Sequence, residues 1–293
     1  MKKLQIRGFM EGKIVKIISN LYTVEANNKL YECRARGKIR YDKLTPLVGD
    51  KVKFDEKENY ILEILPRKNN LDRPSISNID SALIITSVKK PDLSLNLLDK
   101  QITLCMINNI EPIIVFTKLD LLKNSELKYI KFIMKYYSSI GIKVCTNNNL
   151  FKLKRYIKNK TLVLTGQTGA GKSSLLNKLD KKLNLATNEI SEALGRGKHT
   201  TRHVELFKYK TSLIADTPGF SSLDLNDVSL DDIKNSFVEF SRVECPYKDC
   251  THTKEKECKI KELVDNKKIL KSRYENYLGL VNMYGNSRVF SKK

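Results

Sequence analysis

The sequence contains no apolar stretch approaching the roughly 18 residues that a membrane-spanning helix needs. It also lacks a secretory leader, because Lys2 and Lys3 are not followed by an apolar run. We therefore expect a cytoplasmic protein with no membrane partner. Internal repeats and low-complexity tracts are absent, and 41% apolar residues exclude wholesale disorder. A length of 293 residues suggests two or three domains.

Acidic residues are scarce relative to basic ones. There are 33 Asp and Glu against 54 Lys and Arg, so the formal net charge is +21. The surplus is 7 in residues 1–70, 11 in residues 71–225 and 3 in residues 226–293, and no basic tail exists. Such a charge favours a polyanionic partner, although a general Lys and Asn bias of composition would produce the same number.

The first 65 residues are rich in short β-branched segments separated by turns. Five such segments within so short a stretch are typical of a small all-β barrel. An OB-fold, which often binds oligonucleotides, is our prediction, and an SH3-like barrel fits the same pattern. The predicted strands are 12–18, 21–26, 29–36, 48–54 and 60–65.

After a predicted linker at 66–70, buried strands alternate with helices, which indicates a parallel α/β sheet. From about residue 226 the chain is polar and helical. The predicted domains are thus a barrel at 1–66, an α/β domain at 71–225 and a C-terminal helical domain at 226–293. The predicted strands of the sheet are 81–88, 112–116, 142–145, 161–164 and 212–215, with helices at 95–108 and 127–140.

Residues 166–173 read Gly-Gln-Thr-Gly-Ala-Gly-Lys-Ser and fit the phosphate-loop pattern G-x-x-x-x-G-K-[ST]. A predicted strand at 161–164 precedes the motif and a helical run at 174–179 follows it, as this motif requires. Backbone N–H groups of the glycine-rich turn would surround a phosphate. Lys172 would reach the β- and γ-phosphates, and the Ser173 hydroxyl would coordinate Mg²⁺.

Two further motifs follow predicted strands. Asp216-Thr217-Pro218-Gly219 continues the strand at 212–215, so Asp216 could hold Mg²⁺ and the Gly219 N–H could meet the γ-phosphate. Residues 117–120, Thr-Lys-Leu-Asp, resemble the guanine-reading [NT]-K-x-D motif. The Asp120 carboxylate can accept hydrogen bonds from the N1–H and 2-amino groups of guanine together, a pair of donors that adenine does not offer.

The order of these motifs is rotated. An ordinary GTPase begins with the phosphate loop and ends with the base-reading motif, whereas here 117–120 precede 166–173. A circular permutation explains this order, and it is physically easy because domain termini often lie close together. The segment around Asp216 would then lead directly into the C-terminal domain. A shift driven by the γ-phosphate could pass to residues after 226.

Between the two phosphate motifs, residues 195–202 are rich in Gly, basic and hydroxyl residues. Thr200 or Thr201 is the candidate to complete the Mg²⁺ shell. The residue after the Asp-x-x-Gly motif is Phe220, where Ras-like enzymes carry a Gln that orients water. His199 is therefore a candidate for positioning the attacking water, and contact with phosphate or RNA is the alternative role.

A cysteine cluster follows the pattern C-x₄-C-x-H-x₅-C, formed by Cys245, Cys250, His252 and Cys258. Three thiolates and one imidazole make a complete tetrahedral set for a structural Zn²⁺. Such a small domain would depend on the metal to fold. The remaining cysteines, predicted to be small core residues, are Cys33, Cys105 and Cys145.

The motifs at 117–120, 166–174, 195–201 and 216–220, followed by the cysteine cluster, resemble in that order the circularly permuted small ribosomal subunit biogenesis GTPases of the RsgA/YjeQ type. The resemblance covers essentially the whole chain. It implies an OB-fold, a permuted P-loop GTPase domain and a C-terminal zinc domain. It further implies GTP hydrolysis stimulated by the small (30S) ribosomal subunit, late in its maturation, with rRNA contacts by the flanking domains. Thr117 in place of Asn is a departure from the commoner motif.

The motifs nominate a set of nucleotide contacts for GTP or GDP. They are Thr117, Lys118, Leu119, Asp120, Gly166, Gln167, Thr168, Gly169, Ala170, Gly171, Lys172, Ser173, Ser174, Asp216 and Gly219. The candidate catalytic residues are His199, Lys172, Thr200 and Thr201, and the candidate Mg²⁺ ligands are Ser173, Thr200, Thr201 and Asp216.

Three functions are compatible with the sequence. The first is a GTPase acting as a timer on the maturing subunit, and the second is an RNA-binding module with a slow nucleotide switch. The third is a P-loop ATPase or kinase of another class, for which no lid or transporter signature is found. We expect a monomer, because no coiled-coil heptads occur.

Overall fold

The computed structural model describes residues 9–35, 45–72, 74–180, 204–215 and 228–290, with the side chains of all of these except 72 and 284–290. The chain forms two compact units. The first unit comprises Met1–Ala82, Ile157–Thr165 and Ser173–Phe220, and the second comprises Leu83–Tyr156, Gly166–Lys172 and Ser221–Lys293.

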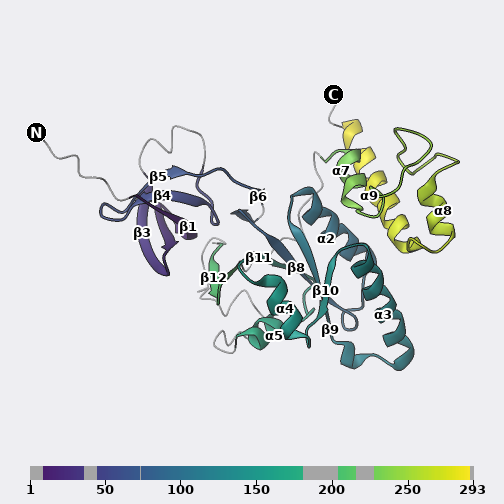
Figure 1. The fold of residues 1–293 in the computed structure, drawn as a ribbon, viewed down its shortest axis with the longest axis horizontal. Coiled ribbons are helices and arrows are strands. Elements are labelled where there is room, and N and C mark those ends of the chain that lie inside the picture. The colour runs from purple at the N-terminus through teal and green to yellow at the C-terminus, as the bar shows by residue number, and fades with distance from the viewer. Residues whose placement is uncertain (1–8, 36–44, 73, 181–203, 216–227, 291–293) are drawn as a thin grey trace, which may run out of the picture. The chain divides into compact units, whose positions relative to one another are not determined.

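The first unit begins with the predicted barrel, whose strands close in the order β1-β2-β3-β5-β4 (Figure 1). The β3–β5 pair is parallel and the other pairs are antiparallel, which is the arrangement of an OB-fold rather than of an SH3-like meander. Alternate residues such as Ile14, Val24 and Phe54 are fully buried and fill the interior. The strands are β1 (Phe9–Ile18), β2 (Leu21–Ala26), β3 (Lys29–Ala35), β4 (Lys51–Asp55) and β5 (Tyr60–Ile64).

The segment at 66–70, predicted as a linker, is instead held firmly against the barrel. Arg67 donates from Nε and Nη2 to the two carboxylate oxygens of Asp50, at 2.7 and 2.8 Å. Asp50 is fully buried and also accepts from the Ser77 hydroxyl at 2.6 Å. Two short strands, β6 (Asn70–Asp72) and β7 (Ser75–Ser77), pair just beyond this contact.

The central sheet has six strands in the order β10-β9-β8-β11-β13-β12. The pairs β9–β10 and β11–β13 are parallel, as predicted, while β12 runs antiparallel to β13 and was not predicted. The strands are nearly continuous apolar runs because both faces of such a sheet are covered. They are β8 (Ser81–Ser87), β9 (Glu111–Thr117), β10 (Lys143–Thr146), β11 (Thr161–Thr165), β12 (Leu206–Tyr209) and β13 (Ser212–Ala215).

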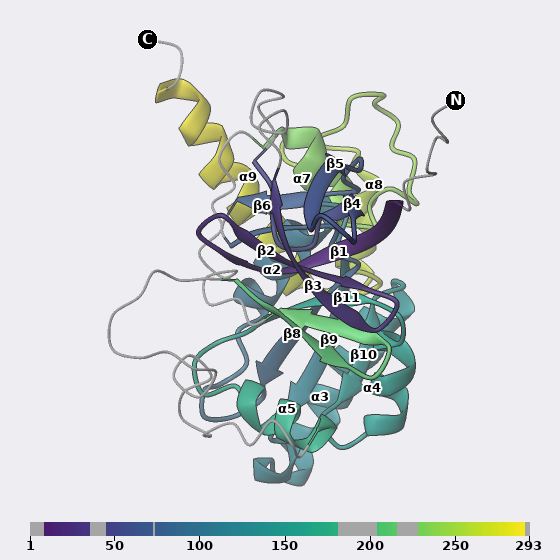
Figure 2. The ribbon, with the colours of Figure 1, turned by 90° about the vertical axis from the view of Figure 1, so that its left-hand side faces the viewer.

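Helices alternate with these strands, and α2 and α3 of the second unit lie together alongside β9 and β10 (Figures 1 and 2). The Ser94 hydroxyl caps α2 by accepting from the Leu97 N–H. None of the helices in the described residues combines the length and apolar character that a bilayer span requires. The helices of this region are α2 (Leu95–Ile107), η1 (Leu119–Leu121), α3 (Asn124–Ser139), α4 (Leu150–Ile157) and α5 (Lys172–Leu179).

The C-terminal part of the second unit is helical, as predicted. Its core is aromatic: Phe237 and Phe240 pack against Tyr277, with ring centroids 5.2 and 5.0 Å away. The helices are α7 (Leu230–Ser236), α8 (Lys259–Asp265) and α9 (Lys271–Phe290).

Candidate nucleotide and metal sites

The predicted phosphate loop connects β11 to α5. Gly166 has φ 141°, and a Cβ there would lie 2.1 Å from the carbonyl oxygen of Ile85, so only glycine fits. Gly171 also has a positive φ, of 95°. The Lys172 ammonium donates to the carbonyl oxygens of Gly166 and Gln167, at 2.7 and 2.8 Å. The loop is therefore tightly curved, and the Lys172 side chain folds back onto its own loop.

This loop lies at the point where the strand order reverses. From β8 the chain proceeds through β9 to β10 on one side of the sheet, whereas after β11 it continues to β12 and β13 on the other side. Ligands of open α/β sheets bind at the carboxyl ends of the strands at such a switch point. The switch point coincides with the phosphate loop, as expected of a nucleotide site.

The Thr-Lys-Leu-Asp motif meets the phosphate loop directly. Thr117 is buried at the end of β9, and its hydroxyl donates to the carbonyl oxygen of Ala170 at 2.6 Å. Lys118 adopts a left-handed conformation with φ 60° and donates from Nζ to the carbonyl oxygen of Lys90. Asp120 follows in η1 and is exposed. Two motifs that lie about 50 residues apart in the sequence are thus in direct contact.

A further polar group at this site was not predicted. The Asn147 N–H donates to the carbonyl oxygen of Phe116 at 3.0 Å, which places Asn147 next to the end of β9. Its side-chain Oδ1 is buried and has no hydrogen-bond partner within the described part of the chain. Because an unpaired buried acceptor is costly, a ligand N–H at this position would be stabilising. The sequence around 145–147 carries no recognisable motif.

Several predicted site residues lie outside the described residues. They are His199, Thr200, Thr201, Asp216, Gly219 and Phe220.

The predicted metal ligands come together in the second unit. The ligand atoms of Cys245, Cys250, His252 and Cys258 all lie within 4.8 Å of one another. The Sγ atoms of Cys245 and Cys258 are 3.9 Å apart, and His252 Nδ1 lies 3.6 and 3.4 Å from them. Tetrahedral Zn²⁺ with ordinary bond lengths requires about 3.8 Å between two sulfurs and about 3.5 Å between sulfur and nitrogen. The donor set therefore fits zinc in both chemistry and spacing.

Neighbouring residues hold the loop that carries His252. Tyr274 and Tyr277 of α9 donate from their hydroxyls to the carbonyl oxygens of His252 and Thr251, at 2.7 and 2.5 Å. Burial raises the pKa of Cys250 to about 12. A bound dication would offset this cost by stabilising the thiolate.

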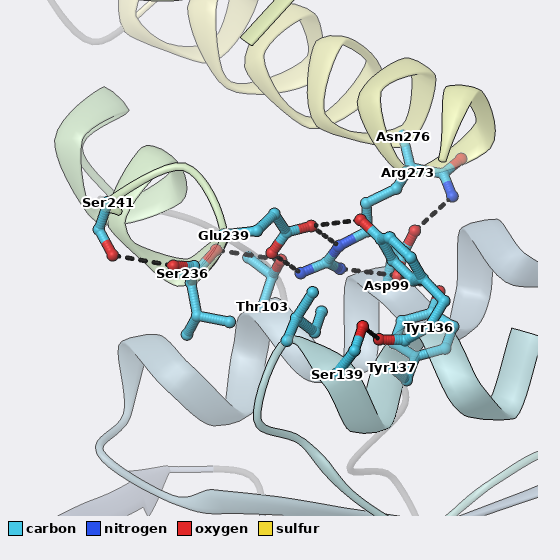
Figure 3. Close-up of polar contacts among 12 residues, drawn as sticks. Asp99, Thr103, Tyr136, Tyr137, Ser139, Ser236, Glu239, Ser241, Arg273 and Asn276 are labelled. Carbon is cyan, nitrogen blue, oxygen red and sulfur yellow. Dashed lines mark hydrogen bonds and ion pairs between the residues drawn. The ribbon is translucent and has the colours of Figure 1, made fainter. Parts of the chain in front are cut away.

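A buried ion network, which no sequence pattern indicated, lies between α2, α9 and residue 239 (Figure 3). Arg273 has no exposed side-chain surface; its Nη1 lies 2.7 Å from Asp99 Oδ1 and its Nε 2.8 Å from Glu239 Oε1. Asp99 also accepts from the hydroxyl of Tyr137 at 2.6 Å and from Asn276 Nδ2 at 2.7 Å. The network ties the C-terminal helices to α2 and α3 within the second unit.

A phosphate loop at the switch point of an α/β sheet, in contact with a Thr-Lys-Leu-Asp segment that precedes it in the chain, is the arrangement of a circularly permuted P-loop GTPase. Comparison with known proteins agrees. The RsgA GTPase family model matches residues 64–226, and the RsgA N-terminal domain model matches residues 11–61. The chain belongs to the RsgA family of GTPases.

Individual relatives cover nearly the full chain. It is 46% identical to small ribosomal subunit biogenesis GTPase RsgA 2 of Oceanobacillus iheyensis, over 92% of this chain and 95% of the relative. It is 41% identical to the RsgA of Enterococcus faecalis, over 97% and 99%. Among solved structures, YloQ, a circularly permuted GTPase, matches with a TM-score of 0.82 and 33% identity over 98% and 99% of the two chains. YjeQ from Thermotoga maritima matches with a TM-score of 0.81 and 33% identity over 93% and 97%.

Proposed function

We propose that this chain hydrolyses GTP to GDP and phosphate during late maturation of the small ribosomal subunit, and that the subunit stimulates the hydrolysis. Family membership and the names of its relatives, small ribosomal subunit biogenesis GTPases, support this role. A cytoplasmic location follows from the role, since ribosomes mature there.

The observation that carries the proposal is the hydrogen bond from the Thr117 hydroxyl to the carbonyl oxygen of Ala170. It joins the base-reading motif to the phosphate loop although their order in the chain is reversed. A Thr-Lys-Leu-Asp segment that occurred by chance would not be expected to contact the phosphate loop.

The residues have distinct roles in this proposal. Backbone N–H groups of the loop at 166–171 hold the phosphates, together with Lys172. Ser173 binds Mg²⁺, which supplies charge neutralisation at the phosphates, and Asp120 reads guanine. Roles for Ser174 in phosphate binding, for Asp216, Thr200 or Thr201 in Mg²⁺ binding, for Gly219 at the γ-phosphate, and for His199 in orienting water rest on the sequence.

The flanking domains serve binding. The barrel at 1–66 and the domain at 226–293, stabilised by Zn²⁺ on the three cysteines and His252, contact rRNA on either side of the GTPase domain at 71–225. The net charge of +21, spread over the chain, suits a broad polyanionic surface. Binding to the subunit should therefore weaken steeply with salt.

Hydrolysis of GTP and of ATP, each with and without purified small subunits, tests the proposal. We expect the chain to hydrolyse GTP but not ATP, and we expect the small subunits to accelerate the hydrolysis of GTP. Preference for ATP would overturn the GTPase assignment. A rate of GTP hydrolysis that does not change when small subunits are added would instead support an RNA-binding module with a slow nucleotide switch.

The base specificity has a sharper test. Asp120→Asn replaces one acceptor with a donor, so it should lose GTP and gain xanthosine triphosphate, whose base carries a carbonyl in place of the 2-amino group. Glu56→Gln, an exposed carboxylate in a barrel turn, is the matched charge control and should keep GTP preference. Unchanged GTP affinity in Asp120→Asn would remove this residue from the base site.

A further inference from the structure

A pocket lies in the first unit, where the start of β11 meets β1 and β4 of the barrel. Its volume is about 330 Å³. None of its lining residues belongs to the nucleotide site or to the cysteine cluster. Its charged lining consists of four lysines and one carboxylate: Lys13, Lys51, Lys68, Lys160 and Asp80.

Lys13 of β1 is only partly exposed in this pocket. Its ammonium donates to the Thr161 hydroxyl at 2.6 Å, which satisfies one of its three N–H groups. Burial lowers the pKa of Lys13, the negative charges of Asp80 and Glu25 oppose this shift, and the positive charge of Lys51 adds to it. No carboxylate among the described residues forms an ion pair with Lys13 or Lys51. Lys13 and Lys51 thus bring two ammonium groups to the pocket that form no ion pair among the described residues.

The single carboxylate of the lining is already engaged. Asp80 Oδ2 accepts from the Thr161 N–H at 2.8 Å, and its Oδ1 lies 3.4 Å from Lys68 Nζ. The lining therefore carries four ammonium groups and one carboxylate, a surplus of three positive charges in a hollow. Such a concentration of one sign in a concave site attracts an anion.

We propose that this pocket binds phosphate groups of an RNA backbone. Lysine contacts phosphates as a point charge and does not read bases. Lys51 and Lys68 are exposed, so the positive charge continues from the hollow onto the surface. A polymer that crosses the pocket can contact both the lysines inside it and the exposed lysines at its edge, whereas a small ion cannot. The choice of RNA rests on the proposed role in subunit maturation.

The pocket is separate from the nucleotide site. Thr161 begins β11, and the phosphate loop follows the other end of this strand after Thr165. A strand of five residues spans about 17 Å. RNA binding can therefore be measured while GDP fills the nucleotide site.

The test measures binding of a fluorescent RNA of about 12 nucleotides, within the range of site sizes of an OB-fold, to the full chain in excess GDP, as a function of salt. The double variant Lys51→Gln/Lys68→Gln should bind about tenfold more weakly. Its plot of log affinity against log salt should be shallower by about one unit per lysine removed. Two RNAs of unrelated sequence should lose affinity equally, because phosphates carry no base identity. Lys128→Gln/Lys154→Gln, exposed on α3 and α4, is the control with the same change of charge.

Lysine acylation followed by mass spectrometry gives the position independently. RNA should protect Lys13, Lys51, Lys68 and Lys160 but not Lys154. Equal labelling with and without RNA, or equal loss of affinity in the pocket and control variants, would overturn the proposal. Protection by inorganic tripolyphosphate but not by RNA would also overturn it, in favour of a free oligophosphate ligand.

The pocket variant should keep the basal rate of GTP hydrolysis, which shows that it folds. Failure of wild-type protein to respond to small subunits would refute the proposed function. The assay with naked RNA does not depend on that response, so the two failures are distinguishable.

Discussion

Replacing Arg273 by methionine should destabilise the second unit more than any surface substitution. Methionine roughly keeps the volume but leaves Asp99 and Glu239 buried without their cation. Breaking a buried ion pair in this way costs about 3–5 kcal/mol. The upper part of that range fits here, because the guanidinium makes two contacts under 3 Å and stacks 4.1 Å from the centroid of the Phe237 ring.

Two companion variants separate charge from packing. Arg273→Lys keeps the charge but loses the planar fork, so its cost should lie near 1.5–3 kcal/mol, roughly that of hydrogen bonds to charged groups. Adding Asp99→Asn and Glu239→Gln to Arg273→Met removes the stranded charges and should recover most of the loss.

The pH dependence has a definite sign. Burial raises the pKa of Asp99, and the charge of Arg273 opposes that shift. Without Arg273 the pKa of Asp99 in the folded state lies still further above its unfolded value, so the loss of stability is full at any pH above that folded pKa. The deficit of Arg273→Met should therefore shrink as the pH falls through the folded pKa.

Urea unfolding followed by circular dichroism suits this chain, which has no tryptophan. Hydrogen exchange of α9 amides assigns the loss to the second unit. A cost below about 1 kcal/mol for Arg273→Met, or a deficit that grows on acidification, would refute the reasoning.

Three further predictions concern other elements. Gly166→Ala forces a Cβ against the carbonyl oxygen of Ile85 and should weaken binding of a fluorescent GTP analogue at least tenfold, whereas Gly279→Ala, with open space around it, should leave binding unchanged. Cys258→Ser should reduce the metal content from one zinc per chain, by elemental analysis, while Cys145→Ala should not; retention of full zinc by Cys258→Ser would contradict the ligand set. Glu126 accepts hydrogen bonds from the Lys89 ammonium and the Lys123 N–H, and these bonds lower its pKa in the folded state. Protection of the first α3 amides from hydrogen exchange should therefore decline as the pH falls below the unfolded pKa of about 4.5 and through the lower folded pKa. Hydrogen exchange of Glu126→Gln should lack that decline.

Local patterns predicted most of the fold. The barrel strands and most strands of the central sheet follow from β-branched or apolar runs bounded by turns, and the phosphate loop follows from its glycines. The closed barrel and the approach of the cysteines and His252 are confirmed. The three remaining cysteines are buried, as predicted for small core residues.

Long-range polar pairs could not be predicted in the same way. Arg273 meets Asp99 across 174 residues, and on a polar helix its charge looks like an ordinary solvated one. Arg67 occurs in a stretch with the composition of a linker, yet it neutralises a buried carboxylate. The short strand β12 has four residues and gives too brief an alternation to recognise.

The contact between Arg67 and Asp50 determines where the barrel can be cut from the rest of the chain. A fragment ending at residue 66 would retain Asp50 but lose both the guanidinium and the Ser77 hydroxyl that satisfy it. A barrel fragment that keeps these contacts should therefore extend to about residue 79, where Asn69 also accepts from the Ile79 N–H. Arg67 and Ser77 thus supply hydrogen bonds that the buried Asp50 of the barrel requires.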